Sequence, residues 1–472
     1  MKKSDVRQDG IIKIIPGERF TPYSLALKLK AKVILESSSY QKGRERYSLL
    51  MLQEAFRVSQ VGDKVVFSKK SAPFEIKNPG KDILDVLMYF ARQHPNPAQD
   101  FPFPAGGIGY LSYEFSARCD TIKINPDKAD PLGLPEGIFL FGHIFAVFDH
   151  YTDMIYLIGL NYKEAEIDLE AAIGDIEKKI ADLDFNYMAA PEKKYPAKIL
   201  DDLEDEKLKY CQGVEEVRKE IIAGNLLQGV LSRRLQIETD ITAMEAYRHL
   251  RSSNPSPYLF MLDFDEFQIF GASPEVHVKV KDGVGTIQPI AGTRRRGKTE
   301  TEDRSLEKEL LADKKEVAEH LMLVDLARND LGRICEPGSV VVKELNTVER
   351  YSHVMHIVSK VQGKLKPGQM GIDALRATFP AGTVSGAPKI RAIEVLDRLE
   401  PVKRTFYAGV VGYVDADGSL DTCISIRCGL KKGKLLVLQA GAGLVYDSNP
   451  EREWEETNEK LRATAASVGL EV

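Results

Sequence analysis

The chain has 472 residues, more than one ordinary hydrophobic core holds, so two domains or one large composite sheet are expected. Apolar residues make up 43% of the chain, as in soluble globular proteins, and 65 basic against 70 acidic residues give a net charge of −5. Without a basic excess, nucleic acid is not expected as a partner.

Targeting and redox signals favour a cytoplasmic protein without a membrane anchor. No run of about eighteen apolar residues occurs, and the best candidate, Gly137–Phe148, is short and contains His143. The charged segment Met1–Asp5 is followed by no apolar stretch, so no signal peptide is expected. The five cysteines form no CxxC pair, which predicts free thiols.

A change in composition divides the chain. Residues 189–206 are rich in Lys, Asp, Glu and Pro and poor in large apolar side chains. We therefore expect a mainly β and mixed region over residues 1–190 and an α+β region over residues 200–472.

Two segments of the second region, Asp205–Ala223 and Asp313–Leu326, have the apolar spacing of amphipathic helices. The side chains expected to face the core are Leu208, Val214 (or Cys211), Val217 and Ile221 in the first segment, and Val317, Leu321 and Val324 in the second.

The pattern between these helices is that of strands. Tyr258–Leu262 and Gln268–Phe270 read as two strands joined by a turn at Asp263–Glu266. The alternation in Val276–Val280, followed by Asp282-Gly283, predicts a further hairpin.

Residues 407–445 predict a three-stranded antiparallel meander with tight turns at Asp417-Gly418 and Lys432-Gly433. These turns place Arg427 in the middle strand, facing Ala408 on one side and Leu438 on the other, with registers free to slip by a residue or two.

Tyr407, Arg427 and the Gly441–Gly443 loop then converge near one end of the meander. A guanidinium, a phenol and closely approaching backbone amides suit a carboxylate. A lone Gly-x-Gly fits a β-bulge equally well.

Two pairs of glutamates occur at helical i, i+3 spacing. Glu316 and Glu319 lie in the second predicted helix, and Glu453 and Glu456 lie in a C-terminal helix that Asn449 and Pro450 begin. Such carboxylates suit Mg²⁺, which takes hard oxygen ligands and keeps water or substrate in its remaining positions. The alternatives are a capping box of Asp313 with Glu316 and a surface ion pair of Glu456 with Lys460.

Candidate acid–base residues are Glu275, in the segment Gly271–Glu275, and His356, in His353–His356. Taken singly, each is more often a structural polar residue than a catalyst. The segment Gly382–Lys389, which contains Thr383, is not a phosphate loop of the Walker A type, because Ala387 stands where that motif needs glycine.

Two motifs carry a family resemblance: Pro289–Gly297, with the letters PIAGTRRRG, and Pro380–Lys389, with the letters PAGTVSGAPK. They resemble the chorismate-utilising enzymes, and most closely the large subunits of anthranilate synthases. The related aminodeoxychorismate synthases usually carry lysine at the position of Ala291, so alanine favours anthranilate formation.

The resemblance implies an α+β fold, a layered sandwich of large antiparallel sheets with flanking helices. It also implies Mg²⁺-dependent conversion of chorismate and ammonia to anthranilate and pyruvate. No cysteine of this chain lies in a Gly-x-Cys-x-Gly elbow, so ammonia is expected from a separate glutamine amidotransferase subunit or from solution.

The resemblance also implies roles for single residues. Glu275 matches a general acid that protonates the departing C4 hydroxyl, and His356 a histidine of the later step, in which the ring loses its enolpyruvyl group. Gln228 stands where isochorismate-forming relatives have a water-activating lysine. The resemblance further implies that the substrate contacts Thr383, Gly292, Thr293, Tyr407, Arg427, Gly441, Ala442 and Gly443. It implies that the metal ion is bound by Glu319 and Glu456, with Glu316 and Glu453 beside them.

A second resemblance lies in the first half. Leu35-Glu36-Ser37 and Asn254–Leu259 resemble the tryptophan feedback site of anthranilate synthases, which implies L-tryptophan as an inhibitor that contacts Ser37, Pro257, Tyr258 and Leu259. Leu259 replaces the usual methionine, a swap that conserves volume.

Single residues of the sequence oppose three other functions. Aminodeoxychorismate synthase is opposed by Ala291, and isochorismate or salicylate synthase by Gln228. A non-catalytic amino-acid sensor is opposed by the complete set Glu275, Glu319, His356, Arg427 and Glu456.

Overall fold

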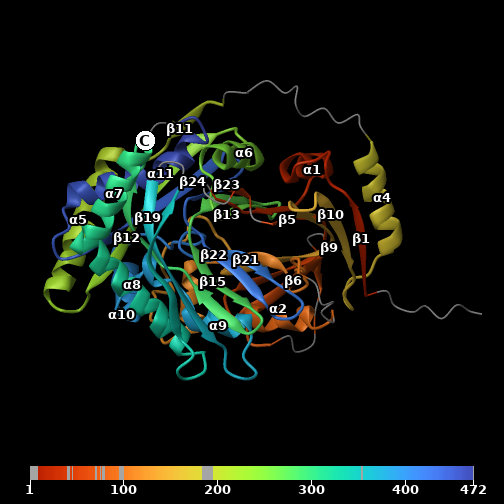
Figure 1. Ribbon diagram of the computed structural model, residues 1–472, viewed down its shortest axis with the longest axis horizontal. Helices are drawn as coiled ribbons and strands as arrows, with labels where there is room; N and C mark the ends of the chain where they lie inside the picture. Colours follow the sequence, from red (N-terminus) through yellow and green to blue (C-terminus); the bar gives the residue numbers. More distant parts are fainter. Residues whose placement is uncertain are drawn as a thin grey trace, which may run out of the picture.

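The computed structural model describes residues 9–39, 43–44, 46–69, 72–74, 76, 80–94, 100–182, 195–351 and 354–470. It has an α+β fold in which 22 strands join one continuous sheet and helices cover the outside (Figure 1). The long ladders of this sheet are antiparallel, as the fold prediction required.

The first region is built mainly of strands. Its strands are β1 (Gly10–Pro16), β2 (Val33–Glu36), β3 (Ser38–Ser39), β4 (Gly43–Arg44), β5 (Tyr47–Val61), β6 (Lys64–Lys69), β7 (Ala72–Phe74), β8 (Ile108–Leu111), β9 (Gly137–Asp149) and β10 (Met154–Leu160). Its helices are α1 (Pro22–Leu29), α2 (Ile83–Ala91), the 3-10 turn η1 (Tyr113–Phe115), α3 (Ser116–Cys119) and α4 (Leu169–Ala181).

The second region alternates strands and helices. Its strands are β11 (Ala197–Ile199), β12 (Gln228–Thr239), β13 (Tyr258–Asp263), β14 (Gln268–Ser273), β15 (Val276–Lys281), β16 (Val284–Ile287), β17 (Ile290–Arg295), β18 (Val341–Arg350), β19 (Val354–Lys364), β20 (Gly386–Ala387), β21 (Val410–Val414), β22 (Leu420–Ile424), β23 (Cys428–Lys432) and β24 (Leu435–Leu444). Its helices are α5 (Leu203–Ile222), α6 (Ala243–Ser253), α7 (Glu300–Ala312), α8 (Lys314–Gly332), α9 (Gly371–Thr378), the 3-10 turn η2 (Gly382–Val384), α10 (Lys389–Leu399) and α11 (Pro450–Ala466).

Strands of the two regions pair directly with each other. β2 pairs with β13, with Glu36 opposite Leu259, and β8 pairs with β21, with Leu111 opposite Val410. Residues 183–194, which contain the start of the predicted boundary, lie outside the described residues. The division into 1–190 and 200–472 stays a prediction.

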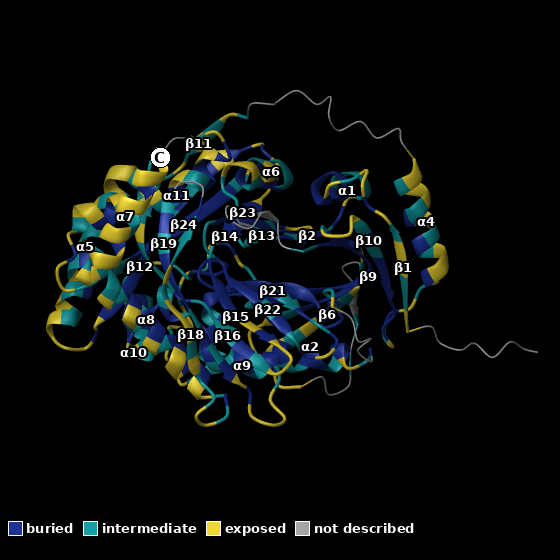
Figure 2. Cartoon of the chain, viewed as in Figure 1, coloured by how far each residue is buried: buried dark blue, intermediate teal, exposed yellow. Residues whose placement is uncertain are grey.

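The sheet separates the two largest apolar cores of the described residues. Along β5, Leu49 and Met51 belong to one core, whereas Leu50 and Leu52 belong to the other, because successive side chains of a strand point to opposite faces. The first core contains residues of α2 and α9, and the second contains residues of α1, α4, α6 and α11. Figure 2 shows the buried strands in the centre and the exposed faces of α4, α5 and α7 at the periphery.

Burial on both faces explains the longest apolar segment of the sequence. Every residue of β9 is buried, so this strand reads as a continuous apolar run rather than an alternation. No described helix combines the length and apolarity that a membrane span requires. All five cysteines are free thiols, as predicted.

Both predicted helices exist, but the positions of their buried faces were partly wrong. Leu208 of α5 is 59% exposed and Leu321 of α8 is 42% exposed. The buried face of α8 instead contains two polar residues, His320 and Asp330, which an apolar pattern does not detect. The predicted strands and turns between Tyr258 and Val280 are confirmed by the β13–β14 and β15–β16 hairpins.

The predicted three-stranded meander was wrong in its middle strand. That segment is broken into β22, which pairs with β21 and β15, and β23, which pairs with β14 and β24. Arg427 lies in the break with φ 52°, a left-handed conformation that cannot continue a strand. The chain therefore passes from one pair of neighbouring strands to another at Arg427, which faces neither Ala408 nor Leu438.

The predicted glycine loop was also wrong. Gly441, Ala442 and Gly443 lie within β24 and pair with Ser232, Leu231 and Val230 of β12. Glycine is needed here because other groups approach closely. A Cβ atom on Gly441 would lie 2.9 Å from the Leu231 carbonyl oxygen, and one on Gly443 would lie 2.8 Å from Gln228 Nε2.

Candidate active site

The candidate site residues gather around the last residues of β24. Gln228 begins β12 beside this strand and donates a hydrogen bond from Nε2 to Glu319 Oε1 of α8 at 3.1 Å. A Cβ atom on Gly443 would lie 3.8 Å from the same Glu319 oxygen. The start of β12, the end of β24 and the middle of α8 therefore form one wall.

The two glutamate pairs face a common region from α8 and α11. Burial raises the pKa of Glu319, and the negative charges of Glu316 and Glu456 raise it further. Burial also raises the pKa of Glu453, with Glu456 adding to the shift and Ser448 opposing it. Because Glu456 of α11 influences Glu319 of α8, the fold brings one carboxylate of each pair near the other, while the role of the four glutamates as metal ligands stays a prediction.

The carboxylates already have partners of their own. Arg294 Nη1 donates to Glu316 Oε1 at 3.2 Å, and Lys460 Nζ lies 2.8 Å from Glu456 Oε1, as the helical spacing predicted. Among the described residues, no three His, Cys, Asp or Glu side chains gather closely enough to hold a metal ion by themselves.

This donor set fits Mg²⁺ nevertheless, because that ion is usually held by one or two protein carboxylates and completed by substrate and water. A divalent cation between α8 and α11 would relieve the like-charge repulsion that raises the pKa of Glu319.

A cationic cluster lies beside Gly441 of β24, next to Glu456. Arg427 Nη1 donates to the Lys460 carbonyl oxygen at 3.0 Å, and Lys460 Nζ donates to the Gly441 carbonyl oxygen at 2.8 Å. The Tyr407 hydroxyl lies next to Gly441, 3.2 Å from where a Cβ atom would stand. Burial lowers the pKa of Arg427, and Tyr407 and Glu456 oppose that shift. A guanidinium, an ammonium and a phenol are thus available for a carboxylate.

Lys460 was not predicted as a site residue. In the sequence, Lys460 stands four residues after Glu456, and a surface ion pair with Glu456 is a sufficient reason for a lysine there. Only the packing of α11 against β24 shows that the Lys460 ammonium also reaches the Gly441 carbonyl oxygen. A lysine one helical turn after a candidate metal ligand was the signal that sequence reasoning could have used.

Glu275 connects β14 to β15 and is 7% exposed. Burial raises the pKa of its carboxyl to about 8, and the nearby Thr383 hydroxyl and the Lys460 charge oppose a part of that shift. The carboxyl is therefore protonated at neutral pH, as a general acid must be.

His356 of β19 is held by β17. Its Nδ1 donates to the Gly292 carbonyl oxygen at 3.0 Å and lies 3.2 Å from Thr293 Oγ1. Since a carbonyl only accepts, the proton stays on Nδ1 and the lone pair is on Nε2. Burial, opposed by the hydrogen bond to Gly292 and helped by the charges of Arg427 and Lys460, lowers the pKa of His356 to about 4, so the ring is neutral.

Gly292 makes this geometry possible. Its φ of +67° belongs to the left-handed region, and the β17–β19 register shifts between Ala291 and Thr293. A Cβ atom would also lie 3.2 Å from Glu316 Oε2.

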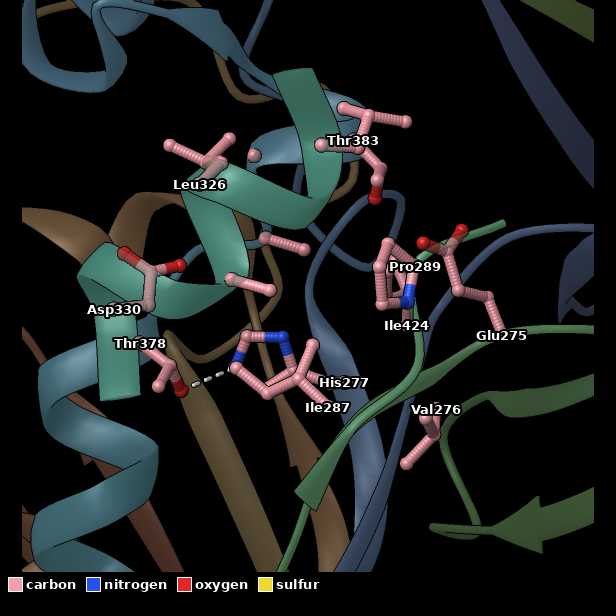
Figure 3. Close-up of a pocket in the computed structure, with 14 residues that line it drawn as sticks. Glu275, Val276, His277, Ile287, Pro289, Leu326, Asp330, Thr378, Thr383 and Ile424 are labelled. Atoms are coloured by element: carbon pink, nitrogen blue, oxygen red, sulfur yellow. Dashed lines mark hydrogen bonds between the residues drawn. The ribbon is translucent and has the colours of Figure 1, made fainter. Parts of the chain in front are cut away.

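A small cavity of about 30 Å³ adjoins Glu275 (Figure 3). Thr383 of η2 lines the cavity from above in this view. His277 of β15 lines it from below, on the side where Thr378 lies. His277 was not predicted as a site residue, because the alternation of β15 explains it as an ordinary core position.

The two segments of the second resemblance lie side by side. Ser38 N donates to the Ser256 carbonyl oxygen at 3.0 Å, and Glu36 pairs with Leu259. Ser37 is half-buried at this junction. The Tyr258 hydroxyl donates a hydrogen bond to Asp421 Oδ1 at 2.8 Å, and Leu259 is buried in the second core. The fold thus joins Ser37 to the Pro257–Leu259 segment despite their separation in sequence.

Comparisons with known proteins agree with one another. The family model described as chorismate binding enzyme matches residues 44–466. A relative from Spirochaeta aurantia, named anthranilate synthase component 1, is 66% identical over 464 residues, covering 98% of this chain and 96% of the relative. One of the same name from Acinetobacter calcoaceticus is 40% identical over 476 residues, with 95% and 93% covered.

Two solved structures share the fold. Anthranilate synthase component I from Streptococcus pneumoniae TIGR4 superposes with a TM-score of 0.77 at 36% identity, covering 89% of this chain and 92% of that one. The menaquinone-specific isochorismate synthase from Escherichia coli gives a TM-score of 0.74 at 21% identity, with 97% and 94% covered, which shows the fold alone.

Proposed function

The chain belongs to the family of chorismate-binding enzymes, and we propose that it converts chorismate and ammonia to anthranilate and pyruvate as the large subunit of an anthranilate synthase. The observation that carries this proposal is the buried position of Glu275, which raises the pKa of its carboxyl to about 8, within a site that also holds a cluster of cations. The 66% identity to a relative named anthranilate synthase component 1 supports the same reaction.

In the first step, the Glu275 carboxyl gives its proton to the C4 oxygen of chorismate, the C4–O bond breaks, and water leaves. Ammonia bonds to C2 while the ring double bonds shift. Gln228 cannot act as a base for water, and its amide is occupied with Glu319, so ammonia, which is already a nucleophile, needs no activation there.

In the second step, His356 Nε2 removes the proton from C2, the C3–O bond breaks with its electron pair on oxygen, and the departing enolpyruvate takes up a proton at its methylene carbon to become pyruvate. The hydrogen bond from Nδ1 to Gly292 keeps the lone pair on Nε2 for this purpose. Arg427, Tyr407 and Lys460 bind one carboxylate of chorismate. Glu319 and Glu456, with Glu316 and Glu453 beside them, would hold Mg²⁺, which supplies positive charge for the other carboxylate.

The test of this function uses the purified chain with chorismate and Mg²⁺. Ammonium salts at alkaline pH are expected to give anthranilate, detected by its fluorescence, whereas glutamine is expected to give none, because the sequence has no glutaminase nucleophile. Adding a glutamine amidotransferase subunit should restore the glutamine-dependent reaction. Formation of anthranilate from glutamine by the chain alone would refute the proposal that a separate subunit supplies the ammonia.

Glu456→Gln is expected to raise the Mg²⁺ concentration needed for half-maximal turnover, because one of the facing carboxylates is lost. Glu456 is only half-buried, and such surface changes usually alter stability by within about 0.5 kcal/mol. Glu455→Gln, on the exposed face of the same helix, is the matched control. Wild-type turnover of Glu456→Gln at limiting Mg²⁺ would leave Glu456 as a surface partner of Lys460.

Tryptophan inhibition is expected to act through the junction of Ser37 with Pro257–Leu259. From there Tyr258 pairs with Ser273, two residues before Glu275, and Ala272 N donates to the Arg427 carbonyl oxygen at 3.0 Å. A ligand at the junction can therefore favour a conformation with a poorly formed site, with a coupling of about 1–3 kcal/mol.

Ser37→Phe is accordingly expected to abolish inhibition by tryptophan while uninhibited turnover stays near wild type. Ser252→Phe, on the exposed face of α6, is the control for an added aromatic ring. The measurement is anthranilate formation with saturating ammonium and limiting chorismate over a range of tryptophan concentrations. An unchanged response of the Ser37 variant would place the regulatory site elsewhere.

A further inference from the structure

We propose that the cavity beside Glu275 receives the water molecule that leaves C4, and that His277 holds this water by accepting its hydrogen bond. The inference rests on the proposed function, because the first step of that reaction releases water next to Glu275. Its new element is His277, which lies outside the substrate-binding and acid–base set described above and shares the cavity with Glu275 and Thr383 of that set.

The size of the cavity matches one small molecule. Its volume of about 30 Å³ exceeds the roughly 10–15 Å³ that one water needs, and it is far too small for a substituted six-membered ring. Apolar side chains, including Leu323, Leu326 and Ile287, form part of its lining. A water there needs polar partners, so the polar lining decides whether it binds.

Two of the polar groups in the lining are already occupied. Both Asp330 oxygens accept from Lys389 Nζ, at 2.8 and 2.7 Å. The Thr378 hydroxyl donates to the Ala374 carbonyl oxygen at 2.9 Å. Neither group competes for a molecule in the cavity.

His277 presents a lone pair to the cavity. Because Thr378 Oγ1 has given its hydrogen to Ala374, it accepts from His277 Nε2, which lies 3.1 Å away (dashed in Figure 3). Burial lowers the pKa of His277 to about 3, so the ring is neutral and Nδ1 carries no proton. His277 is 3% exposed, and its Nδ1 has no hydrogen-bond partner among the described residues.

Thr383 supplies a second polar atom. Its Oγ1 is buried and forms no hydrogen bond of normal geometry with any described residue, although it lies near enough to Glu275 to influence that carboxyl. A water in the cavity would donate one hydrogen to His277 Nδ1 and share a hydrogen bond with Thr383. Two otherwise unsatisfied buried groups are thereby paired.

The step balances without a further reactant. The C4–O bond breaks with its electron pair on oxygen, and the Glu275 proton completes the water. The nitrogen of ammonia forms a bond to C2, and one proton of the resulting ammonium group restores the Glu275 carboxyl. A site that accepts the water stabilises the departing oxygen and keeps the water away from the ring.

The experiment compares the two chemical steps in single turnovers with chorismate, ammonium and Mg²⁺, followed by rapid quench and mass spectrometry. His277→Leu keeps the approximate size of the side chain and removes the acceptor. It is expected to slow chorismate consumption roughly tenfold, the loss equivalent to one hydrogen bond, while conversion of the amino intermediate to anthranilate keeps its rate.

Two further variants keep the test independent of one substitution. His277→Asn, whose Oδ1 can replace Nδ1 as acceptor, is expected to restore most of the first-step rate. Ala327→Val, which narrows the cavity from α8, is expected to slow the same step. A crystal structure of the wild-type protein is expected to show a water bound to His277 Nδ1.

A wild-type first step in His277→Leu, equal slowing of both steps, failure of Asn to restore the rate, or a cavity without water density would each overturn the inference. The unchanged second step serves as the internal check that the variant is folded. If the wild-type chain makes no anthranilate from ammonium, the proposed function itself fails, and the two failures are thereby distinguished.

Discussion

Glu275→Gln is expected to abolish nearly all consumption of chorismate, with a loss of about 10²–10⁴ in rate, the usual contribution of a positioned proton donor. The amide has nearly the same shape and remains in the same buried position, but it cannot give a proton to the C4 oxygen. No amino intermediate should form. Chorismate remaining after reaction with ammonium and Mg²⁺, measured by mass spectrometry, is the readout.

The pH dependence of the wild-type enzyme tests the same assignment. The acid must be protonated, and burial places its pKa at about 8. The measured quantity is the rate constant for chorismate consumption, divided by the concentration of unprotonated ammonia so that the titration of ammonia itself is removed. This quantity should therefore be constant below pH 8 and fall above it. Glu238→Gln, at an exposed position of β12, should show the wild-type profile. A first step that stays fast well above pH 8 would contradict Glu275 as the acid.

His356→Asn is expected to leave the first step intact and block the second. The asparagine amide can still donate to the Gly292 carbonyl oxygen, so the β17–β19 contact is kept, but the basic Nε2 is gone. An amino-substituted chorismate should accumulate while anthranilate and pyruvate formation fall by about 10²–10⁴.

Product analysis over time decides this prediction. His249→Asn, in which a half-buried histidine of α6 that binds the Ser467 carbonyl is changed, is the matched control and should turn over normally. Because burial lowers the pKa of His356 to about 4, its neutral form predominates at every pH above that value, and the wild-type second step should lose rate only below it. Equal loss of both steps in His356→Asn would refute the separate roles.

Features encoded within a few residues could be predicted from the sequence. The hairpin at Asp282-Gly283, the cap at Asn449 and the helix containing Glu316 and Glu319 depend on local turn chemistry and apolar spacing, and the structure confirms them. The fold class and the main set of site residues followed from the family resemblance rather than from these patterns.

Features that depend on distant segments could not be predicted locally. The alternation from Leu420 to Lys432 continues through the break at Arg427, so only the pairing of β22 and β23 with different neighbours reveals the turn. The raised pKa of Glu275 depends on its burial among η2, β15 and α8. No residue close to Glu275 in the sequence indicates this burial. That His277 Nδ1 has no partner among the described residues, and no proton to donate, follows only when the hydrogen bonds of Thr378 are known.

The pairing of β2 with β13 and of β8 with β21 also bears on how the chain reaches its native state. Each region alone would present an unpaired strand edge, the kind of surface on which chains aggregate. The contacts that cover these edges join residues such as Glu36 and Leu259, and contacts so distant in sequence form slowly. During synthesis the edge of β2 can be covered once β13 has been made, whereas the edge of β8 stays uncovered until β21 follows about 150 residues later, so β8 is the edge exposed for longer.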